Sequence, residues 1–233
     1  MRLTRAKREY VVVSVGGSLI VPDQIDTGFL KSLRELVLRK ISDGLSFYII
    51  AGGGKLARRY QEAAGSVLGT LSAEDSDWLG IHATRLNAWL VRTLFLKESS
   101  DRIVKNPERA VNTKYPVIVG GGFKPGNSTD LAAVMAAKTV GAKKVVNLSN
   151  IDYVYTADPR SNPDAKKIER ISWKDFRALI PKEWDPGLSS PFDPVAAKEA
   201  EAAKLEVVVI NGTRLGELEN YLSGKPFIGT VIG

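Results

Sequence analysis

Three glycine-rich turns hold the residues of this sequence whose types and spacing could do chemistry. They are SVGGS at residues 14–18, AGGGKLARRY at 51–60 and GGGFKPGNSTD at 120–130. Glycine lets backbone amides approach an anion, and a helix that follows adds the positive end of its dipole. One such cluster would be interpreted as a tight turn only. Three clusters favour the binding of a polyphosphate together with a second phosphate.

The common phosphate-binding motifs are absent from these turns. No GxxxxGK[ST] pattern occurs in the sequence, which excludes a P-loop enzyme. The residues from Gly52 to Lys55 do not fit GxGxxG, so dinucleotide binding has little support.

Composition narrows the function classes further. The chain has 233 residues, of which 44% are hydrophobic and 25% charged, and it can bury a sizeable core as one large domain or two small lobes. The lack of cysteine excludes disulfides and thiolate chemistry, and the single histidine excludes a two-histidine mechanism or a histidine-rich metal site. No apolar run approaches the roughly 18 residues that span a bilayer, and no signal-type apolar core follows the basic start. We therefore expect a soluble, cytoplasmic protein without a membrane partner.

The formal net charge of +7 has two explanations, a nucleic-acid partner or phosphorylated, anionic substrates. The basic residues are spread along the chain, without an aromatic-interleaved stripe or a recognition-helix pattern. We expect no nucleic-acid partner and interpret most of these charges as a solvated basic surface.

The elements that must position the turns alternate along the chain. Short β-branched or fully apolar runs predict buried strands, and apolar residues at helical intervals predict amphipathic helices. The expected strands are residues 11–15, 47–51, 116–119, 144–148, 205–210 and 227–232, and the expected helices are 29–41, 55–64, 77–97, 129–140, 173–179, 195–204 and 217–222. This alternation predicts an α/β fold, a three-layer α/β/α sandwich with a mostly parallel central sheet.

A single domain over residues 1–233 is expected, either as one sandwich or with two lobes facing each other across the strand ends. Residues 1–9 are expected to be a flexible basic lead-in, and residues 152–164 to be irregular. Asp77 is placed as the N-cap of its helix. In open α/β sheets ligands bind beyond the carboxyl ends of the strands, and each glycine cluster is expected at such an end.

The order of six motifs resembles one known family. These are SVGGS, AGGGKLARRY, DWLGIHATRLNA, GGGFKPGNSTD, NIDYVYTADP and PFDPVAAK. Together they resemble the amino acid kinase superfamily and, within it, the uridylate kinases of the archaeal type. The resemblance implies transfer of the ATP γ-phosphoryl group to UMP, giving UDP and ADP, with Mg²⁺ accompanying ATP and no protein ligand to the metal assigned. It also implies a homohexamer built from dimers.

The resemblance implies a role for each motif residue. The residues implied on the ATP side are Gly17, Ser18, Gly54, Arg58, Ser149, Tyr155 and Asp158. Among them, Arg58 would reach phosphate, Tyr155 would pack near the adenine, and Asp158 would take the ribose or base edge. The alternatives are a surface charge for Arg58 and a buried structural role for Tyr155. Arg59 is interpreted as a surface charge.

The residues implied on the UMP side are Gly53, Asp77, Phe123, Lys124, Pro125, Gly126, Asn127, Ser128 and Thr129. Asp77 would bind the sugar, since a carboxylate accepts hydrogen bonds from two hydroxyls. Capping is the alternative for Asp77, Ser128 and Thr129.

Asp193 and Lys198 are the implied catalytic pair. Asp193 stands where the family has a residue near the transferred phosphoryl group, and it could orient Mg²⁺ or a lysine, for which Lys198 is the nearest candidate. The alternative for Asp193 is an N-cap with proline at the first helical position. Asp130 is expected to hold the start of its helix or to shape the electrostatics of the site, and His82 is taken as structural.

Tyr153 departs from the family pattern, which has glycine there. A bulky residue at a turn glycine either shifts the loop or fits a changed φ. Tyr153 therefore keeps a non-catalytic nucleotide-binding protein open as an alternative. A kinase of this superfamily with another small acceptor is a second alternative, although Asp77 and the PGNSTD loop favour a nucleotide acceptor.

Overall fold

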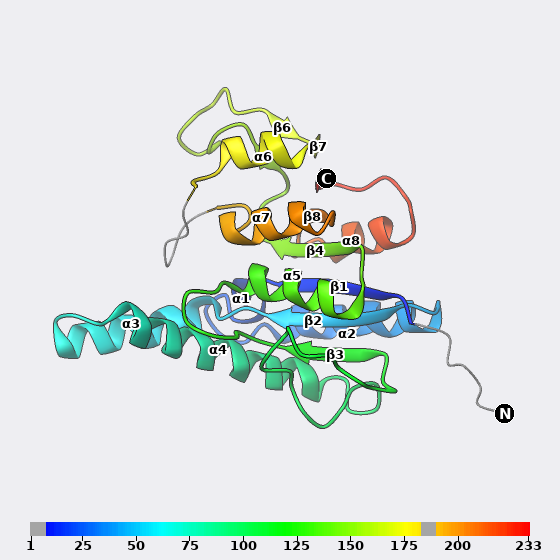
Figure 1. Cartoon of the computed structure of the whole chain (residues 1–233), viewed down its shortest axis with the longest axis horizontal. Coiled ribbons are helices and arrows are strands. Elements are labelled where there is room, and N and C mark those ends of the chain that lie inside the picture. Colours follow the sequence, from blue (N-terminus) through cyan, green and yellow to red (C-terminus); the bar gives the residue numbers. More distant parts are fainter. Residues whose placement is uncertain (1–7, 183–189) are drawn as a thin grey trace.

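A seven-stranded sheet runs through the middle of the molecule, in the order β3-β2-β1-β4-β8-β9-β7 (Figure 1). The computed structural model describes residues 8–182 and 190–233, so the expected lead-in at residues 1–9 lies largely outside the described residues. The strands of this sheet are β1 (Tyr10–Val15), β2 (Ser46–Ala51), β3 (Val117–Gly120), β4 (Lys144–Ser149), β7 (Arg170–Ile171), β8 (Glu206–Asn211) and β9 (Thr230–Ile232).

The sheet is mostly parallel, as the sequence predicts. The first five strands in the order pair parallel to one another, and only β9 joins its neighbour β8 antiparallel. A second, two-stranded sheet pairs β5 (Val154–Tyr155) with β6 (Lys167–Ile168) antiparallel. It lies partly within the stretch 152–164, which was expected to be irregular.

Helices cover both faces of the large sheet. The helices are α1 (Gly17–Ile20), α2 (Thr27–Ser42), α3 (Gly54–Leu68), α4 (Ala73–Thr93), α5 (Thr129–Val140), α6 (Trp173–Leu179), α7 (Pro194–Ala202) and α8 (Leu215–Leu222). One buried cluster joins the sheet to α5, α6 and α7, and a second joins the opposite face to α1, α2, α4 and α8. The three-layer sandwich is therefore confirmed.

Strand residues alternate between these two clusters, which is why the strands are apolar throughout. In β2, Tyr48 and Ile50 point into the α5 side, whereas Phe47 and Ile49 point into the α2 side. Successive side chains of a strand point to opposite faces, so a strand covered on both sides needs apolar residues at every position.

The expected helix at 77–97 with Asp77 as N-cap is wrong at both ends. The helix α4 spans Ala73–Thr93, and its N-cap is Ser72. The Ser72 hydroxyl accepts from the amide of Asp75 at 3.0 Å and donates to its carboxylate at 2.6 Å, which resembles a capping box. This pair lies upstream of Asp77 and starts the helix one turn earlier.

The end strand is also shorter than the expected 227–232. Its paired part is Thr230–Ile232. The amide of Ile228 donates instead to the Glu217 carboxylate at 2.8 Å, so this backbone is held by a side chain and not by a neighbouring strand.

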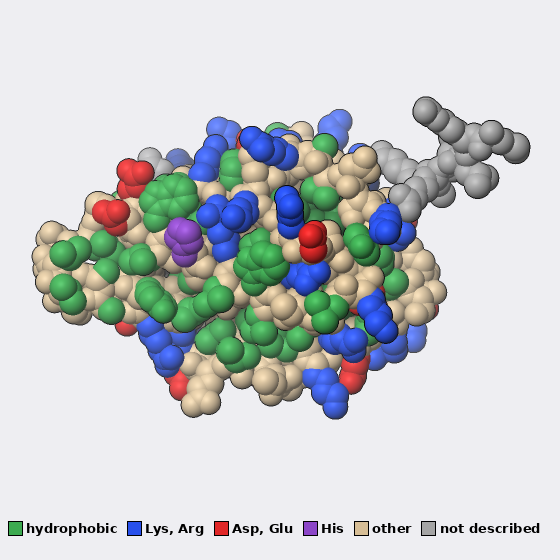
Figure 2. All heavy atoms as spheres, turned by 90° about the horizontal axis from the view of Figure 1, so that it is seen from below, with side chains coloured by type: hydrophobic (Ala, Val, Ile, Leu, Met, Phe, Trp, Pro, Cys, Tyr) green, Lys and Arg blue, Asp and Glu red, His purple; other side chains and the backbone are tan. Residues whose placement is uncertain are grey.

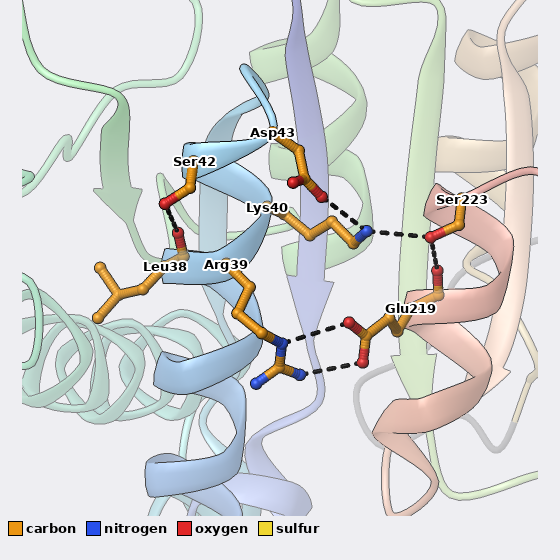
Figure 3. Close-up of polar contacts among 7 residues, drawn as sticks. All are labelled: Leu38, Arg39, Lys40, Ser42, Asp43, Glu219 and Ser223. Carbon is orange, nitrogen blue, oxygen red and sulfur yellow. Dashed lines mark hydrogen bonds and ion pairs between the residues drawn. The ribbon is translucent and has the colours of Figure 1, made fainter.

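Polar contacts join α2 to α8 on one face of the sheet (Figure 3). Arg39 donates to both carboxylate oxygens of Glu219, at 3.3 and 3.0 Å. The ammonium of the buried Lys40 donates to Asp43 at 2.9 Å and to the Ser223 hydroxyl at 3.0 Å. A buried ammonium is costly without such partners. The contacts therefore tie a helix from the start of the chain to one near its end.

Exposed apolar side chains gather on α3 and α4. They include Tyr60, Val67, Leu68, Trp78, Leu86 and Trp89. Figure 2 shows apolar side chains in a band across the side of the molecule on which α4 lies. Among the helices within residues 8–182 and 190–233, none is long and apolar enough to cross a membrane.

Candidate active site

The turns after β1 and β2 are pressed against each other at the carboxyl edge of the sheet. A Cβ added to Gly17 would lie 2.0 Å from the amide nitrogen of Gly54 and 2.5 Å from the carbonyl carbon of Gly53. A Cβ added to Gly54 would lie 2.3 Å from the carbonyl of Gly17, and Gly54 also has a φ of +61°. Only glycine fits at either position. The glycines therefore allow the backbone of each turn to approach the backbone of the other.

This contact brings the starts of α1 and α3 together. The first amides of a helix have no partner within it, and the helix dipole adds positive potential there. A Cβ on Gly54 would lie 2.8 Å from the amide nitrogen of Ser18, so the first turns of the two helices are adjacent. Arg58 follows Gly54 by four residues and lies on the same side of α3. The edge is thus built to receive an anion.

The second glycine triplet is packed against α4. A Cβ on Gly122 would lie 2.8 Å from the Thr84 hydroxyl, and one on Gly121 would lie 3.0 Å from it. The amide of Gly122 donates to this hydroxyl at 2.6 Å, and the hydroxyl donates to the carbonyl of Ile81 at 2.7 Å. Arg85 donates to the carbonyls of Gly122 and Phe123 at 3.3 and 3.1 Å.

The same helix also holds the first triplet. The buried amide group of Asn87 donates to the carbonyl of Gly52 at 2.8 Å and to that of Gly53 at 3.3 Å. Sequence reasoning missed Thr84, Arg85 and Asn87. The signal was present in Thr84 and Asn87, two polar residues three apart on an otherwise apolar helix face, because buried polar side chains need partners.

Asp77 holds the loop that follows the second triplet. Its Oδ2 accepts from the amide of Gly126 at 2.6 Å, and Gly126 has a φ of +74°. Within the loop, the side chain of Asn127 donates to the carbonyl of Pro125 at 3.1 Å. Ser128 caps α5 by accepting from the amide of Leu131 at 3.1 Å. The predicted UMP-side residues Asp77, Gly126 and Ser128 are therefore joined by α4 and the start of α5.

Two carboxylates lie together beneath the turns. Asp130 accepts from the hydroxyl of Ser14 at 3.2 Å and from the amide of Asp193 at 3.3 Å. Burial, together with the charge of Asp193, raises the pKa of Asp130 to about 6. Burial also raises the pKa of Asp193, which caps α7 by accepting from the amide of Ala196 at 2.6 Å. Asp130 therefore contacts the strand before the first turn and the cap of α7.

A pocket of about 580 Å³ opens beyond the ends of β4 and β8. It brings together Ser149, Tyr155 and Asp158, the remaining residues predicted on the ATP side. Arg160 contacts both carboxylate oxygens of Asp158, at 3.1 and 2.8 Å, and lowers the pKa of that carboxyl. Asp158 is therefore already paired. Tyr153 also lines the pocket, and its φ is not positive, because among the described residues outside glycine only Lys204 has a positive φ.

The segment that carries the two tyrosines is tied to the end of β8. The carboxylate of Asp152 accepts from the side chain of Asn211 at 2.7 Å and lies 3.3 Å from the Arg214 guanidinium. This tie was also missed from the sequence, since its partners are far apart along the chain.

Several residues singled out in the sequence have exposed side chains. Lys198 is exposed on α7, and within the described residues no ion pair joins it to Asp193. Arg58 is exposed, and its neighbour Arg59 pairs with Asp23 at 2.6 Å. His82 is exposed on α4, with its ring 6.2 Å from that of Trp78. Among the described residues, no group of three or more His, Cys, Asp or Glu side chains could hold a metal ion.

Known proteins are similar to this chain in sequence and in fold. The model of the amino acid kinase family matches residues 9–211. A uridylate kinase of Methanocorpusculum labreanum is 37% identical over 96% of this chain and 95% of its own length. A uridylate kinase of Thermococcus kodakarensis is 33% identical over 95% of this chain and 98% of its own length. The crystal structure of uridylate kinase from Archaeoglobus fulgidus has a TM-score of 0.81 at 29% identity, and the match covers 96% of this chain and 99% of that one.

Proposed function

The chain belongs to the amino acid kinase family, and we propose that it is a uridylate kinase that transfers the γ-phosphoryl group of ATP to UMP, giving UDP and ADP. The observation that carries the proposal is the contact between Gly17 and Gly54, which places two helix starts side by side at the carboxyl edge of the sheet. Further support comes from the uridylate kinases described above, which match almost the whole chain.

Three binding regions follow one another along this edge. The loop after β3, held by Asp77, takes UMP through Gly53 and the residues from Phe123 to Thr129. The paired turns after β1 and β2 take the ATP phosphates, with Ser18 beside them and Arg58 one turn into α3. The pocket beyond β4 and β8 takes the adenosine. The strand order β3-β2-β1-β4-β8 thus sets acceptor, phosphates and base in a line.

Phosphoryl transfer does not need a covalent intermediate with the protein. The phosphate of UMP is already an anionic nucleophile, so positioning and neutralisation of charge supply most of the rate. Backbone amides of α1 and α3, together with the Arg58 guanidinium, would stabilise charge on the phosphoryl oxygens. The packing of the turns fixes the backbone donors before substrate arrives.

Mg²⁺ enters with ATP, since this ion is usually held by substrate phosphates and one or two carboxylates. Asp130 and Asp193 could supply these carboxylates, because they carry oxygen ligands and a cation would relieve the repulsion between their charges. Bound there, the ion would neutralise charge on the transferring group. Lys198 belongs to the proposal only as a residue that Asp193 could orient.

A homo-oligomer, as in the hexamer implied by the resemblance, is part of the proposal. Support comes from the exposed apolar side chains of α3 and α4, among them Val67, Leu86 and Trp89. Contiguous apolar surface on a globular protein often marks a contact between chains.

The test is ADP release from ATP and Mg²⁺, with UMP, CMP, dUMP, AMP and isopentenyl phosphate offered separately. Turnover restricted to UMP is the expected result. Turnover with another acceptor would favour a different kinase of the family. Nucleotide binding without any turnover would favour a non-catalytic protein.

Arg58 and its neighbour form a matched pair for the same assay. Arg58→Ala should lower kcat/KM by about a hundredfold, since a charge-assisted contact to the transferring group is lost. Arg59→Ala removes an exposed ion pair with Asp23 and should leave turnover unchanged. Equal turnover of the two variants would remove Arg58 from the site.

A further inference from the structure

Two tyrosines, Tyr153 and Tyr155, stand side by side in the pocket beyond β4 and β8. Their ring centroids lie 6.4 Å apart with the planes at 86°, an edge-to-face arrangement. Val154, between them, is buried, whereas both tyrosines line the pocket. Two neighbouring aromatic rings, and not one, therefore line this part of the pocket.

The ring of Tyr153 is fixed from more than one direction. The ammonium of Lys167 lies 5.0 Å from its centroid, within the range of a cation–π contact. Lys167 is itself held by Glu169 at 2.8 Å and by the pairing of β6 with β5, where it stands opposite Tyr155. Just before Tyr153, Asp152 is tied to Asn211. A ring held in this way loses little freedom when a ligand packs on it.

Apolar groups also line the pocket, among them Leu179, Ile180 and Pro181. A volume of about 580 Å³ lies within the range of pockets for small molecules. A flat heteroaromatic base suits such a space, because each of its faces can contact an aromatic or aliphatic group. The phosphate-binding turns lie on the β1 side of β4, so a nucleotide could reach both with one end in the pocket.

We propose that Tyr153 is a specificity-determining residue for the nucleotide donor, with its ring forming a wall on which the purine base stacks. The proposal rests on the proposed function and adds the residue that reads the donor base. A purine offers more stacking area than a pyrimidine, so Tyr153 favours purine over pyrimidine triphosphates. The effect acts on binding of the base and leaves the phosphate contacts unchanged.

The test measures binding to the full chain by calorimetry, with a non-hydrolysable ATP analogue, a non-hydrolysable CTP analogue and inorganic tripolyphosphate as probes. Tyr153→Leu keeps an apolar side chain but removes the aromatic face. It should lower the affinity for the ATP analogue about tenfold, which is the contribution of one base–aromatic stack, and change the affinity for tripolyphosphate by less than about twofold. Tyr153→Phe should match the unchanged protein. The ratio of ATP to CTP affinity should fall in Tyr153→Leu only.

Tyr115→Leu is the control, since Tyr115 precedes β3 at the opposite end of the sheet. It should bind all three probes as the unchanged protein does. If Tyr153→Leu fails to fold, the comparison of Tyr153→Phe with Tyr153→His, which keeps a smaller ring, carries the test. His should then bind the ATP analogue more weakly than Phe.

The outcomes separate this proposal from the function on which it rests. Unchanged or tighter ATP binding by Tyr153→Leu, in a protein that phosphorylates UMP, would overturn the role of Tyr153 alone. An equal loss for the ATP analogue and tripolyphosphate would do the same, because it would show a collapsed pocket. A selective loss of ATP binding without any UMP kinase activity would support Tyr153 and overturn the proposed function.

Discussion

The two glycine triplets look alike in the sequence but differ in what replaces their missing side chains. In the first triplet, Gly52 and Gly54 lie against another stretch of backbone, the turn at Gly17, whereas a Cβ on Gly53 would meet the side chain of Ala57. Gly120–Gly122 has the side chains of Ile50 and Thr84 as its nearest neighbours, and backbone atoms of Val104, Thr84 and Ile81 lie no closer than 3.0 Å to an added Cβ. Backbone in a sheet edge cannot move aside, whereas a side chain can give way at some cost. The first triplet therefore contains positions at which only glycine fits, whereas in the second triplet glycine is favoured by packing.

The largest effect should come from Gly54→Ala. The added methyl would meet the carbonyl of Gly17 at 2.3 Å, and alanine at a φ of +61° is strained. We expect a loss of about 4 kcal/mol or more in the free energy of unfolding, measured by urea denaturation.

Gly65→Ala is the matched control in the same helix. A Cβ on Gly65 meets nothing within 4 Å, so alanine should stabilise the helix by about 0.5–1 kcal/mol. A small cost for Gly54→Ala would contradict the backbone contact described above.

Gly122→Ala should cost less, about 2 kcal/mol, because the closest atom to the methyl is the side-chain hydroxyl of Thr84, at 2.8 Å, and the nearest backbone atom lies 3.3 Å away. Thr84→Ala should relieve this crowding. The double variant should therefore be more stable than the sum of the two single changes predicts, by about 1 kcal/mol in a double-mutant cycle. Additive costs would mean that the second triplet is as rigidly enclosed as the first.

Asp77→Asn should separate the two triplets in function. The change keeps one acceptor for the amide of Gly126 but removes the charge. We expect KM for UMP to rise about tenfold, roughly 1.4 kcal/mol, with KM for ATP nearly unchanged. Asp75→Asn alters only the Ser72 cap of the same helix and should change neither KM. An equal rise in both KM values for Asp77→Asn would count against a loop that serves UMP alone.

The smallest effect concerns Asp130, which links the two regions through Ser14 and Asp193. Its pKa of about 6 exceeds the ordinary 3.8, so the folded state binds a proton more tightly than the unfolded state. Stability from this group is present at low pH and is lost as pH rises through 6. Between pH 5 and 7 the loss should be about 1 kcal/mol. In Asp130→Asn this part of the pH dependence should vanish.

Urea unfolding of both proteins at pH 5, 6 and 7 measures the difference in slope. Asp164→Asn, in an exposed loop, is the control and should keep the slope of the unchanged protein. Parallel pH profiles for Asp130→Asn and the unchanged protein would mean that Asp130 is ionised throughout this range.

The fold was predictable because its signals are local. Fully apolar strands imply helices on both faces, and the helix at 173–179 was predicted at its observed bounds. Caps that compete within one turn are harder to rank, which is why the start of α4 was misplaced from Ser72 to Asp77. The roles of the site residues stay predictions, although the structure brings most of them to one edge. The pattern around Thr84 and Asn87 indicates only that they need partners, and their partners, like that of Asp152, are distant along the chain and cannot be identified from local sequence.

The position of β1 in the sheet has a consequence for synthesis on the ribosome. Its first neighbour, β2, follows after the two helices α1 and α2, but its second neighbour, β4, comes only with residues 144–149. At about 5–20 residues per second, one edge of β1 waits for several seconds without its partner. An unpaired apolar edge is a template for wrong pairing. The nascent chain therefore needs shielding, by a chaperone or by its own helices, until β4 has emerged.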